Sequence, residues 1–371
     1  MTGWIDSNLS LQQLCEELRN KPSLAVDTEF IRTNTFFPQI ALVQLSDGEN
    51  CWLIDVLAID QFAPLKSLFE SSQVMLIFHA CAEDLEVMDY ALGIQPRNIF
   101  DTQVAAGITN IGYNMGYARL VEKIFHTQLD KQETRSNWLA RPLSPEQLNY
   151  AQVDVKYLHP LFDQLNLALH DQQRQAWFAE EMTNLFDLFE KRKQTDDYYL
   201  RIKGAWRLNA KSLSVLKHLC CWRETLARER DKPRSRIIKD TVLYEIARQL
   251  PTTIKQLYSL EDWHPRLIKR YGESLLSEIK AVEQQALMEP LPPPLSKDIM
   301  TVLKTIRARL LIVANDKQIP AEFLCNKKEL EQILRTSAEG NCHWPNRLNE
   351  GWRSLWVKPA IESELESANL L

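Results

Sequence analysis

Short apolar runs separated by turn residues predict a β-sheet in the first part of the chain. Four such runs predict strands, at residues 24–30, 40–45, 51–54 and 74–78. Asp47 and Gly48 form a turn signal between the second and third runs. Because a hairpin joins those two strands, we expect this part of the sheet to be antiparallel.

Between and after these strands, apolar residues recur at helical spacing. The helices predicted in this part of the chain are residues 1–20, 62–69, 82–92, 102–107, 114–125 and 145–169. Pro160 should break or kink the last of them, because proline lacks the N–H that the helix needs. Strands followed by interleaved helices predict a mixed α/β sheet covered by helices. The polar stretch Gln173–Asp197 should form a helical link to a second domain.

From about residue 205 onward the pattern is all helical and contains an internal repeat. Val215-Leu216-Lys217 recurs 87 residues later as Val302-Leu303-Lys304. At the same offset, without a gap, five more pairs align: Ala227 with Ala314, Pro233 with Pro320, Leu243 with Leu330, Ile246 with Ile333, and Arg248 with Arg335. Helical periodicity alone would not align proline and arginine as well. We interpret the repeat as two copies of one small helical domain, separated by the proline-rich residues 290–294.

Composition is that of an ordinary globular protein. The chain has 371 residues, 45% of them hydrophobic and 25% charged, which suggests two or three domains. It has an odd number of cysteines and none at CxxC spacing, which argues against a disulfide framework and a structural zinc site. The N-terminus has no signal-peptide pattern, and no apolar run approaches the ~20 residues that span a membrane. We therefore expect a cytoplasmic protein.

Charge is distributed unevenly along the chain. The formal net charge is −5. Residues 206–270 contain fifteen Lys or Arg and seven Asp or Glu, so this segment carries +8 and the remainder −13. A basic module attracts phosphates, whereas clustered carboxylates can hold divalent cations. The alternative is that both are ordinary solvated surfaces.

Two carboxylates stand at the end of the first predicted strand. Asp27 and Glu29 are two residues apart, so their side chains point to the same face of the strand, and Thr28 between them should point away. Two carboxylates on one face after an apolar run are unfavourable unless something neutralises them. A divalent cation such as Mg²⁺ or Mn²⁺ would do so. An exposed acidic strand end is the other interpretation.

Two further acidic positions lie on predicted helices. Asp84 falls in the first helical turn after the strand at 74–78, where an acid also stabilises any helix dipole. Tyr150 and Asp154 are four residues apart and share a helix face. A phenol beside a carboxylate can orient a water, although such a pair is also common on helix surfaces.

The order and context of these residues resemble the DEDD exonuclease superfamily in its tyrosine subclass. Three segments carry the resemblance: VDTEF at 26–30, HACAEDL at 79–85 and YAQVDVKYL at 150–158. The run from Lys131 to Leu143 resembles the linking signature of the ribonuclease D family. The helical repeats resemble tandem HRDC domains, which bind nucleic acids; Trp222-Arg223 and Asp231-Lys232-Pro233 in the first copy are similar to the HRDC pattern. The second copy departs further from that pattern.

The resemblance implies a fold and a domain order. We expect an α/β ribonuclease H-like exonuclease domain, a mixed sheet flanked by helices, followed by two small all-α HRDC domains. The expected boundaries are 1–170 for the exonuclease domain, 171–205 for a helical linker, 206–289 for the first HRDC domain and 295–371 for the second, degenerate one.

The resemblance also implies a mechanism: two-metal-ion hydrolysis that runs 3′→5′ and releases nucleoside 5′-monophosphates. The metal ligands would be Asp27, Glu29, Asp84 and Asp154, with Asp27 bridging both ions. The ions would be Mg²⁺ or Mn²⁺, with Zn²⁺ or Co²⁺ as substitutes in vitro. Tyr150 would orient the attacking water, since a reference pKa of about 10 makes it a poor base at neutral pH.

The remaining candidates concern the substrate, for which the family suggests transfer RNA precursors and other small structured RNAs. Thr28 and Phe30 are candidates for the pocket of the 3′-terminal base, with core packing the equal alternative for Phe30. His79 is also a candidate, although a structural hydrogen-bonding role is favoured for it. The phosphate-binding candidates are Lys131, Arg135 and Arg141 near the site, where Arg141 could instead brace the fold, and Arg228, Arg230, Lys232, Arg234 and Arg236 in the first repeat.

Two other functions are compatible with the same residues. One is a DNA-directed 3′→5′ exonuclease, because the metal chemistry would be identical and contacts to the 2′-hydroxyl cannot be recognised here. The other is an RNA-binding protein with an idle nuclease site, which the presence of all four acids and the tyrosine disfavours. We expect a monomer with no obligate protein partner and no membrane association.

Overall fold

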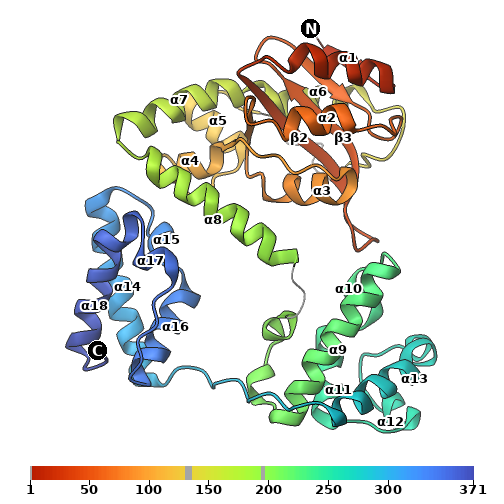
Figure 1. The fold of residues 1–371 in the computed structure, drawn as a ribbon, viewed down its shortest axis with the longest axis vertical. Coiled ribbons are helices and arrows are strands. Elements are labelled where there is room, and N and C mark those ends of the chain that lie inside the picture. The colour runs from red at the N-terminus through yellow and green to blue at the C-terminus, as the bar shows by residue number, and fades with distance from the viewer. Residues whose placement is uncertain (1, 130–135, 194–196) are drawn as a thin grey trace. The chain divides into compact units, whose positions relative to one another are not determined.

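The computed structural model describes residues 2–129, 136–193 and 197–371 (Figure 1). Its described residues form two compact units. The first unit consists of Met1–Ile31, Ile40–Asp187 and Leu295–Leu371, and the second of Arg32–Gln39 and Leu188–Pro294. Among the described residues, no helix combines the length and the apolar character needed to cross a membrane.

The first unit is built on a mixed β-sheet. Its strands are β1 (Thr2–Ile5), β2 (Ser23–Ile31), β3 (Gln39–Ser46), β4 (Cys51–Ile54), β5 (Met75–Phe78) and β6 (Ile99–Asp101). They lie in the order β1-β4-β3-β2-β5-β6. The β3–β4 pair is antiparallel, as the hairpin signal predicts, whereas the β1–β4, β2–β5 and β5–β6 pairs are parallel. The mixed sheet expected from the sequence is confirmed.

Two outer strands are not evident from the sequence. Residues 1–20 were expected to be helical, but Thr2–Ile5 form β1, and the helix begins only at Asn8. Ile99–Asp101 form β6, for which no strand was predicted. Both segments are four residues or shorter, too short to show a periodicity of their own, and their conformation is fixed by backbone pairing with β4 and β5.

Helices flank the sheet (Figure 1). In chain order they are α1 (Asn8–Leu18), α2 (Ala63–Phe69), α3 (Ala82–Leu92), α4 (Thr102–Ile108), α5 (Tyr117–Phe125), α6 (Pro145–Lys156), α7 (Leu158–Asp171) and α8 (Gln175–Lys193). Three of these helices, α3, α6 and α7, pack against β2. The central strand β2 is therefore the common neighbour of the helices on which the candidate acids lie.

The helix predicted at 145–169 is broken between α6 and α7, three residues before Pro160. The break falls at Tyr157, and Pro160 lies in the first turn of α7, where its missing N–H is tolerated. At the break, the Tyr117 hydroxyl donates to the carbonyl of Val153 at 2.8 Å and accepts from the N–H of Tyr157 at 3.1 Å. In a continuous helix those two backbone groups would bond to each other. The Tyr117 side chain is thus inserted at the kink.

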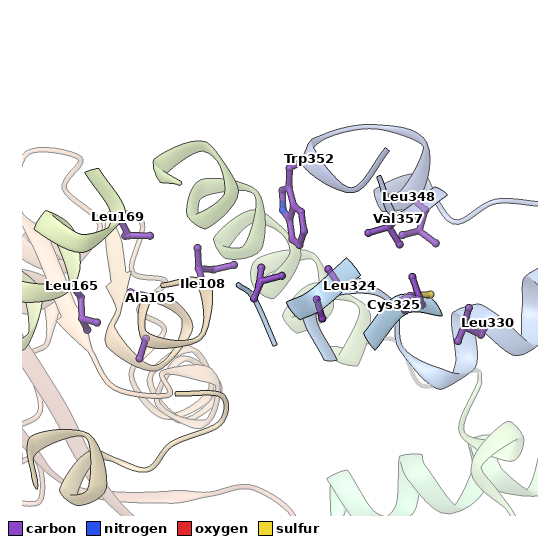
Figure 2. Close-up of a cluster of buried hydrophobic side chains, with 14 of the residues drawn as sticks. Ala105, Ile108, Leu165, Leu169, Leu324, Cys325, Leu330, Leu348, Trp352 and Val357 are labelled. Carbon is purple, nitrogen blue, oxygen red and sulfur yellow. The ribbon is translucent and has the colours of Figure 1, made fainter. Parts of the chain in front are cut away.

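The C-terminal helices belong to the same unit as the sheet. They are α14 (Lys297–Lys317), α15 (Ala321–Leu324), α16 (Lys327–Ala338), α17 (Asn346–Asn349) and α18 (Val357–Ser367). One hydrophobic core includes Ala105 and Ile108 of α4, Leu165 of α7, and Leu324 and Val357 of the C-terminal helices (Figure 2). A Cβ on Gly107 of α4 would collide with the Phe323 ring, so glycine permits this close approach.

Buried charges reinforce the same contact. Arg174 donates to the carbonyls of Ile108, Lys317 and Gln318 at 2.6–3.0 Å. The Arg353 side chain is fully buried, and it pairs with Glu180 at 2.9 Å and Glu181 at 2.5 Å. Because buried charges are tolerated only when they are paired and hydrogen-bonded, these bonds fix the C-terminal helices against α4 and α8.

The second unit is helical. Its helices include α9 (Ala210–Glu229), α10 (Arg234–Ile237), α11 (Asp240–Gln249), α12 (Ile254–Tyr258) and α13 (Pro265–Ala281), around their own hydrophobic core. Three helices of the second unit recur 87 residues later among the C-terminal helices. Helix α10 corresponds to α15 at both ends, and α9 and α11 begin 87 residues before α14 and α16. The internal repeat predicted from the sequence is therefore present in the folded chain.

We expect Arg353→Ala to destabilise the first unit by about 3–5 kcal/mol, because it leaves Glu180 and Glu181 partly buried without their partner. Urea denaturation followed by fluorescence of the tryptophans measures this change. Lys327→Ala is the matched control: it removes an exposed (i, i+4) pair with Glu331 and should change stability by less than about 0.5 kcal/mol. Equal effects of the two substitutions would contradict the role assigned to Arg353.

Candidate active site

Three of the predicted acids converge at the end of β2. Asp27 and Glu29 lie on β2, and Asp154 lies on α6. One ligand oxygen from each of these residues can be chosen so that all three lie within 4.8 Å of one another. Residues far apart in sequence meet here because α6 packs across β2 and β4. Its start is fixed by a capping box between Ser144 and Gln147, with Pro145 in the first turn.

Asp84 joins this group through Thr28. It lies in the first turn of α3 and is 7% exposed. The Thr28 hydroxyl donates to its Oδ1 atom at 2.5 Å. Thr28 is 6% exposed, between the half-buried Asp27 and Glu29, and its hydroxyl is bonded to Asp84 on α3, which packs against β2.

A cavity of about 240 Å³ opens onto three of the acids, Asp27, Glu29 and Asp154, whereas Asp84 is not among the residues that line it. Its lining side chains are Asp27, Thr28, Glu29, His79, Tyr117, Tyr150, Asp154 and Leu158. Tyr117 and Leu158 were not predicted from the sequence. Tyr117 carries no local signal, since it reaches the cavity through its insertion at the kink that follows α6. Leu158 does carry one, because it follows Asp154 by four residues at the end of the segment 150–158.

Burial and mutual repulsion oppose the ionisation of the four acids. Burial, followed by the charge of Asp154, raises the pKa of Asp27. Burial and the neighbouring acids raise the pKa of Glu29 to about 10, and burial raises that of Asp154 to about 7. Burial and the charge of Asp27 also raise the pKa of Asp84. Carboxylates held together in this way require a cation to be ionised at neutral pH.

Tyr150 lies beside Asp154. A hydrogen bond from its hydroxyl partly offsets the upward shift of the Asp154 pKa. Burial, followed by the charge of Asp154, raises the pKa of Tyr150 itself. The phenol is therefore protonated at neutral pH and acts as a hydrogen-bond donor. This agrees with the orienting role expected from the sequence.

The other candidates near the site have mixed outcomes. His79 lines the cavity, but its Nδ1 lies 2.9 Å from the Thr102 hydroxyl and its Nε2 lies 3.0 Å from the Met115 carbonyl. Both ring nitrogens thus have structural partners. Phe30 is half-buried and does not line the cavity. Lys131 and Arg135 lie outside the described residues.

Arg141 has intramolecular partners on every side. It forms a two-bond pair with Asp55 at 2.6 and 2.8 Å and donates to the carbonyls of Ala41, Trp138 and Ala140. These contacts connect β3 to the segment that precedes α6. The guanidinium braces the fold, which is the alternative that the sequence left open for it.

The basic residues of the first repeat fall into two groups. Arg228 and Arg234 both pair with Glu224, which is buried, and both lie over the Phe36 ring at 4.9 and 4.7 Å. The other three candidates, Arg230, Lys232 and Arg236, are exposed. The side chains of Arg228 and Arg234 are partly exposed but engaged with Glu224, whereas the residues of the second group are the more exposed.

The mixed sheet flanked by helices, with acids from β2, α3 and α6 beside a tyrosine, defines a DEDD-type 3′→5′ exonuclease. The family model described as 3′-5′ exonuclease matches residues 2–170, and the one described as HRDC domain matches residues 212–279. The chain is 38% identical to ribonuclease D of Pseudomonas paraeruginosa, with 98% of each chain covered, and 32% identical to ribonuclease D of Escherichia coli, again with 98% of each covered.

The folded chain is similar to a solved structure of the same kind. The crystal structure of Escherichia coli RNase D matches with a TM-score of 0.88 at 30% identity, covering 99% of both chains. The catalytic core of RRP6 from Trypanosoma brucei shares the fold, with a TM-score of 0.55 at 22% identity over 77% of this chain and 81% of that one. The chain belongs to the ribonuclease D family, and its exonuclease domain is of the metal-dependent kind.

The raised carboxyl pKa values predict how the stability of the metal-free protein depends on pH. The folded state holds protons that the unfolded chain has released, so the free energy of unfolding should fall as pH rises. This loss of stability should occur between pH 3.8 and about 7 for Asp154, and between pH 4.5 and about 10 for Glu29. A divalent cation binds the ionised form, so the rise in Tm on adding Mg²⁺ should grow with pH across the same window.

Thermal unfolding in EDTA and in Mg²⁺, at about pH 6 and about pH 8.5, measures this effect. Asp154→Asn is the control and should reduce the difference between the two pH values, because it removes one of the titrating carboxyls. A Mg²⁺-dependent rise in Tm that is the same at both pH values would contradict the prediction.

Proposed function

We propose that this chain is a 3′→5′ exoribonuclease that hydrolyses the terminal phosphodiester bond of RNA and releases nucleoside 5′-monophosphates. Asp27, Glu29, Asp84 and Asp154 would hold two divalent metal ions. The observation that carries the proposal is the convergence of three carboxylates within 4.8 Å, in a cavity that raises their pKa values.

The donor set fits hard divalent cations. All of the candidate ligands are carboxylate oxygens, which suit Mg²⁺ or Mn²⁺ better than softer metals. Among the residues that the structure describes, the lining of the cavity contains three carboxylates and no Lys or Arg, and such ions would neutralise those carboxylates. Two bound ions would stabilise the attacking and leaving oxygens of an in-line displacement. We propose Mg²⁺ or Mn²⁺ as the physiological metal and Asp27 as the residue shared by both ions.

Tyr150 and the residues that line the cavity would position the attacking water and the terminal nucleotide. The protonated Tyr150 hydroxyl would hold the attacking water by a hydrogen bond, and Asp154 beside it would fix the direction of that bond. A cavity of about 240 Å³ is small, which suits a single terminal nucleotide rather than an internal stretch of chain. Thr28 and His79, which line this cavity, would contact that nucleotide.

The helical repeats would hold the body of the RNA. The exposed charges of Arg230, Lys232 and Arg236 support contacts to the phosphate backbone, which need no particular sequence. The similar Escherichia coli protein is described as an exoribonuclease involved in structured RNA processing. We propose transfer RNA precursors and other small structured RNAs as substrates, acted on by a monomer in the cytoplasm. The seven free cysteines are compatible with that reducing compartment.

The decisive assay compares matched RNA and DNA single strands labelled at the 3′ end, with Mg²⁺ and with EDTA. The proposal expects metal-dependent release of labelled mononucleotides, faster from RNA. Faster release from DNA would favour a DNA-directed enzyme instead. RNA binding without release of mononucleotides in Mg²⁺ would favour a non-catalytic RNA-binding protein.

We expect Asp27→Asn and Asp154→Asn to reduce turnover at least about 10³-fold, because each removes a charge that holds the metal ions needed for the displacement. Single-turnover release of mononucleotides at saturating Mg²⁺ measures the loss. Near-normal turnover in either purified variant would overturn the assignment of that carboxylate.

Tyr150→Phe separates water orientation from metal binding in the same assay. Removing only the hydroxyl should lower kcat by about 10²–10⁴-fold, while RNA affinity and the Mg²⁺ concentration for half-maximal activity change little. Unchanged kcat would remove Tyr150 from the mechanism, whereas a large shift in Mg²⁺ dependence would make it part of the metal site.

The exposed basic residues of the first repeat lead to a prediction for RNA binding. Lys232→Ala and Arg236→Ala should each weaken RNA binding uniformly across sequences and reduce the slope of log Kd against log salt by about 1. Arg248→Ala is the control, since Arg248 is exposed but pairs with Glu245. Salt titration of binding to a structured RNA measures both quantities. A salt slope equal to that of the unmodified protein in both variants would show that the RNA lies elsewhere.

A further inference from the structure

The helix that carries Asp84 begins without a cap of its own. Cys81 occupies the N-cap position of α3 and makes no side-chain capping bond. The residue before it, Ala80, has φ of 61°, a left-handed conformation that is unfavourable for a residue with a Cβ. Such a turn persists only when its surroundings hold it in place.

The turn that leads into α3 is held by Asp101, at the end of β6. Its Oδ2 accepts the N–H of Cys81 at 2.8 Å, and its Oδ1 accepts the N–H of Ala80 at 3.1 Å. The same carboxylate caps its own helix α4, accepting the N–H groups of Gln103 and Val104 at 2.8 and 3.2 Å. Asp101 is 1% exposed, so its polar bonds are made to protein rather than to solvent.

The neighbouring residue secures the other end of the same turn. The Thr102 hydroxyl lies 3.0 Å from the carbonyl of Phe78 and 2.9 Å from His79 Nδ1. Phe78 and Asp101 are paired in the parallel β5–β6 ladder. The turn from β5 into α3 is therefore held at both ends by two consecutive residues of the β6–α4 junction, which fixes the direction in which α3 leaves the sheet.

The placement of Asp101 is electrostatically unfavourable for Asp84. Its negative charge adds to the burial and the Asp27 charge that raise the pKa of Asp84. A neutral cap such as Ser or Asn would avoid this repulsion but would lack a second acceptor oxygen. The Asp101 carboxylate accepts four backbone N–H bonds, two from the turn before α3 and two from α4.

We propose that Asp101 is a positioning residue, which sets the Asp84 carboxylate against Asp27 by holding the backbone of Ala80 and Cys81. This inference rests on the proposed role of Asp84 as a metal ligand. Residues that orient metal ligands without touching the metal typically change affinity or activity about 10–100-fold when they are substituted. Asp101 would act on Asp84 through the backbone, because Cys81 precedes Asp84 by about one helical turn.

The test is Asp101→Asn in the full chain, with Asp47→Asn as the matched control. The amide group replaces one acceptor by a donor that faces backbone N–H groups. Asp47 also accepts two backbone N–H bonds in a turn, from Glu49 at 3.1 Å and Asn50 at 2.8 Å, but does not line the cavity. Asp101→Ser is a second variant: serine still caps α4 but is too short to hold both α4 and the turn.

Calorimetric titration with Mn²⁺ gives a readout that does not depend on activity. In both Asp101 variants we expect Mn²⁺ affinity and kcat to fall about tenfold or more, with KM changed less than about threefold. Asp47→Asn should leave Mn²⁺ affinity and kcat unchanged, whatever its effect on Tm.

Two outcomes overturn the inference. One is a folded Asp101 variant with unchanged Mn²⁺ affinity and kcat, and the other is a loss matched by Asp47→Asn. A failure of the proposed function is distinguishable from both, because in that case the unmodified protein itself would bind no Mn²⁺ and release no mononucleotides.

Discussion

The constraint on which this exonuclease domain depends is the repulsion among carboxylates that must lie together in a buried place. Asp27, Glu29 and Asp154 bring ligand oxygens within 4.8 Å of one another, and burial and neighbouring charges raise their pKa values. Unfavourable groups of this kind stay together only if the surrounding structure is stable enough to hold them. The strand and the helices around the site hold these carboxylates together.

Much of this support comes from backbone geometry, and the Arg141–Asp55 ion pair adds to it at the segment that precedes α6. The acids on β2 are fixed by a central strand whose apolar residues Leu24, Ala25 and Val26 are fully buried. Asp154 is fixed by a helix that starts at a capping box and is followed by a kink into which the Tyr117 hydroxyl is inserted. In this way the site keeps its negative charge available for cations while the cost of assembling it is offset by packing elsewhere.

The parts of the site that the sequence predicts are those with a local signature. Strand periodicity puts Asp27 and Glu29 on one face, and helical spacing puts Tyr150 and Asp154 on another. Each signal alone leaves an ordinary surface role open, and the resemblance to the DEDD exonucleases is what singles out these residues together with Asp84. The bond from Thr28 to Asp84 and the bonds that Asp101 accepts from Ala80 and Cys81 join residues 56 and about 20 positions apart, so no local pattern could predict these contacts. For the same reason the short strands β1 and β6, whose conformation comes from pairing with a neighbour, were not predicted.

The two helical repeats show that one local structure can serve different contacts. Asp231 and Gln318 stand 87 residues apart, and each adopts a left-handed conformation after the long helix of its repeat. In the first repeat the Asp231 carboxylate accepts the N–H groups of Phe36 and Phe37 at 2.9 and 3.0 Å. In the second, the carbonyl of Gln318 accepts from Arg174 at 3.0 Å.

In each repeat, the residue after the long helix therefore binds a segment from elsewhere in the chain. The side chains around this residue make contacts within the protein that stabilise the fold. In the first repeat these include Arg228 and Arg234, which share the single carboxylate of Glu224 and lie over the Phe36 ring. A count of basic residues in the sequence cannot separate them from Lys232 and Arg236, which are exposed. The capacity of a helical repeat to bind nucleic acid therefore depends on the charges that remain exposed after its internal contacts are made.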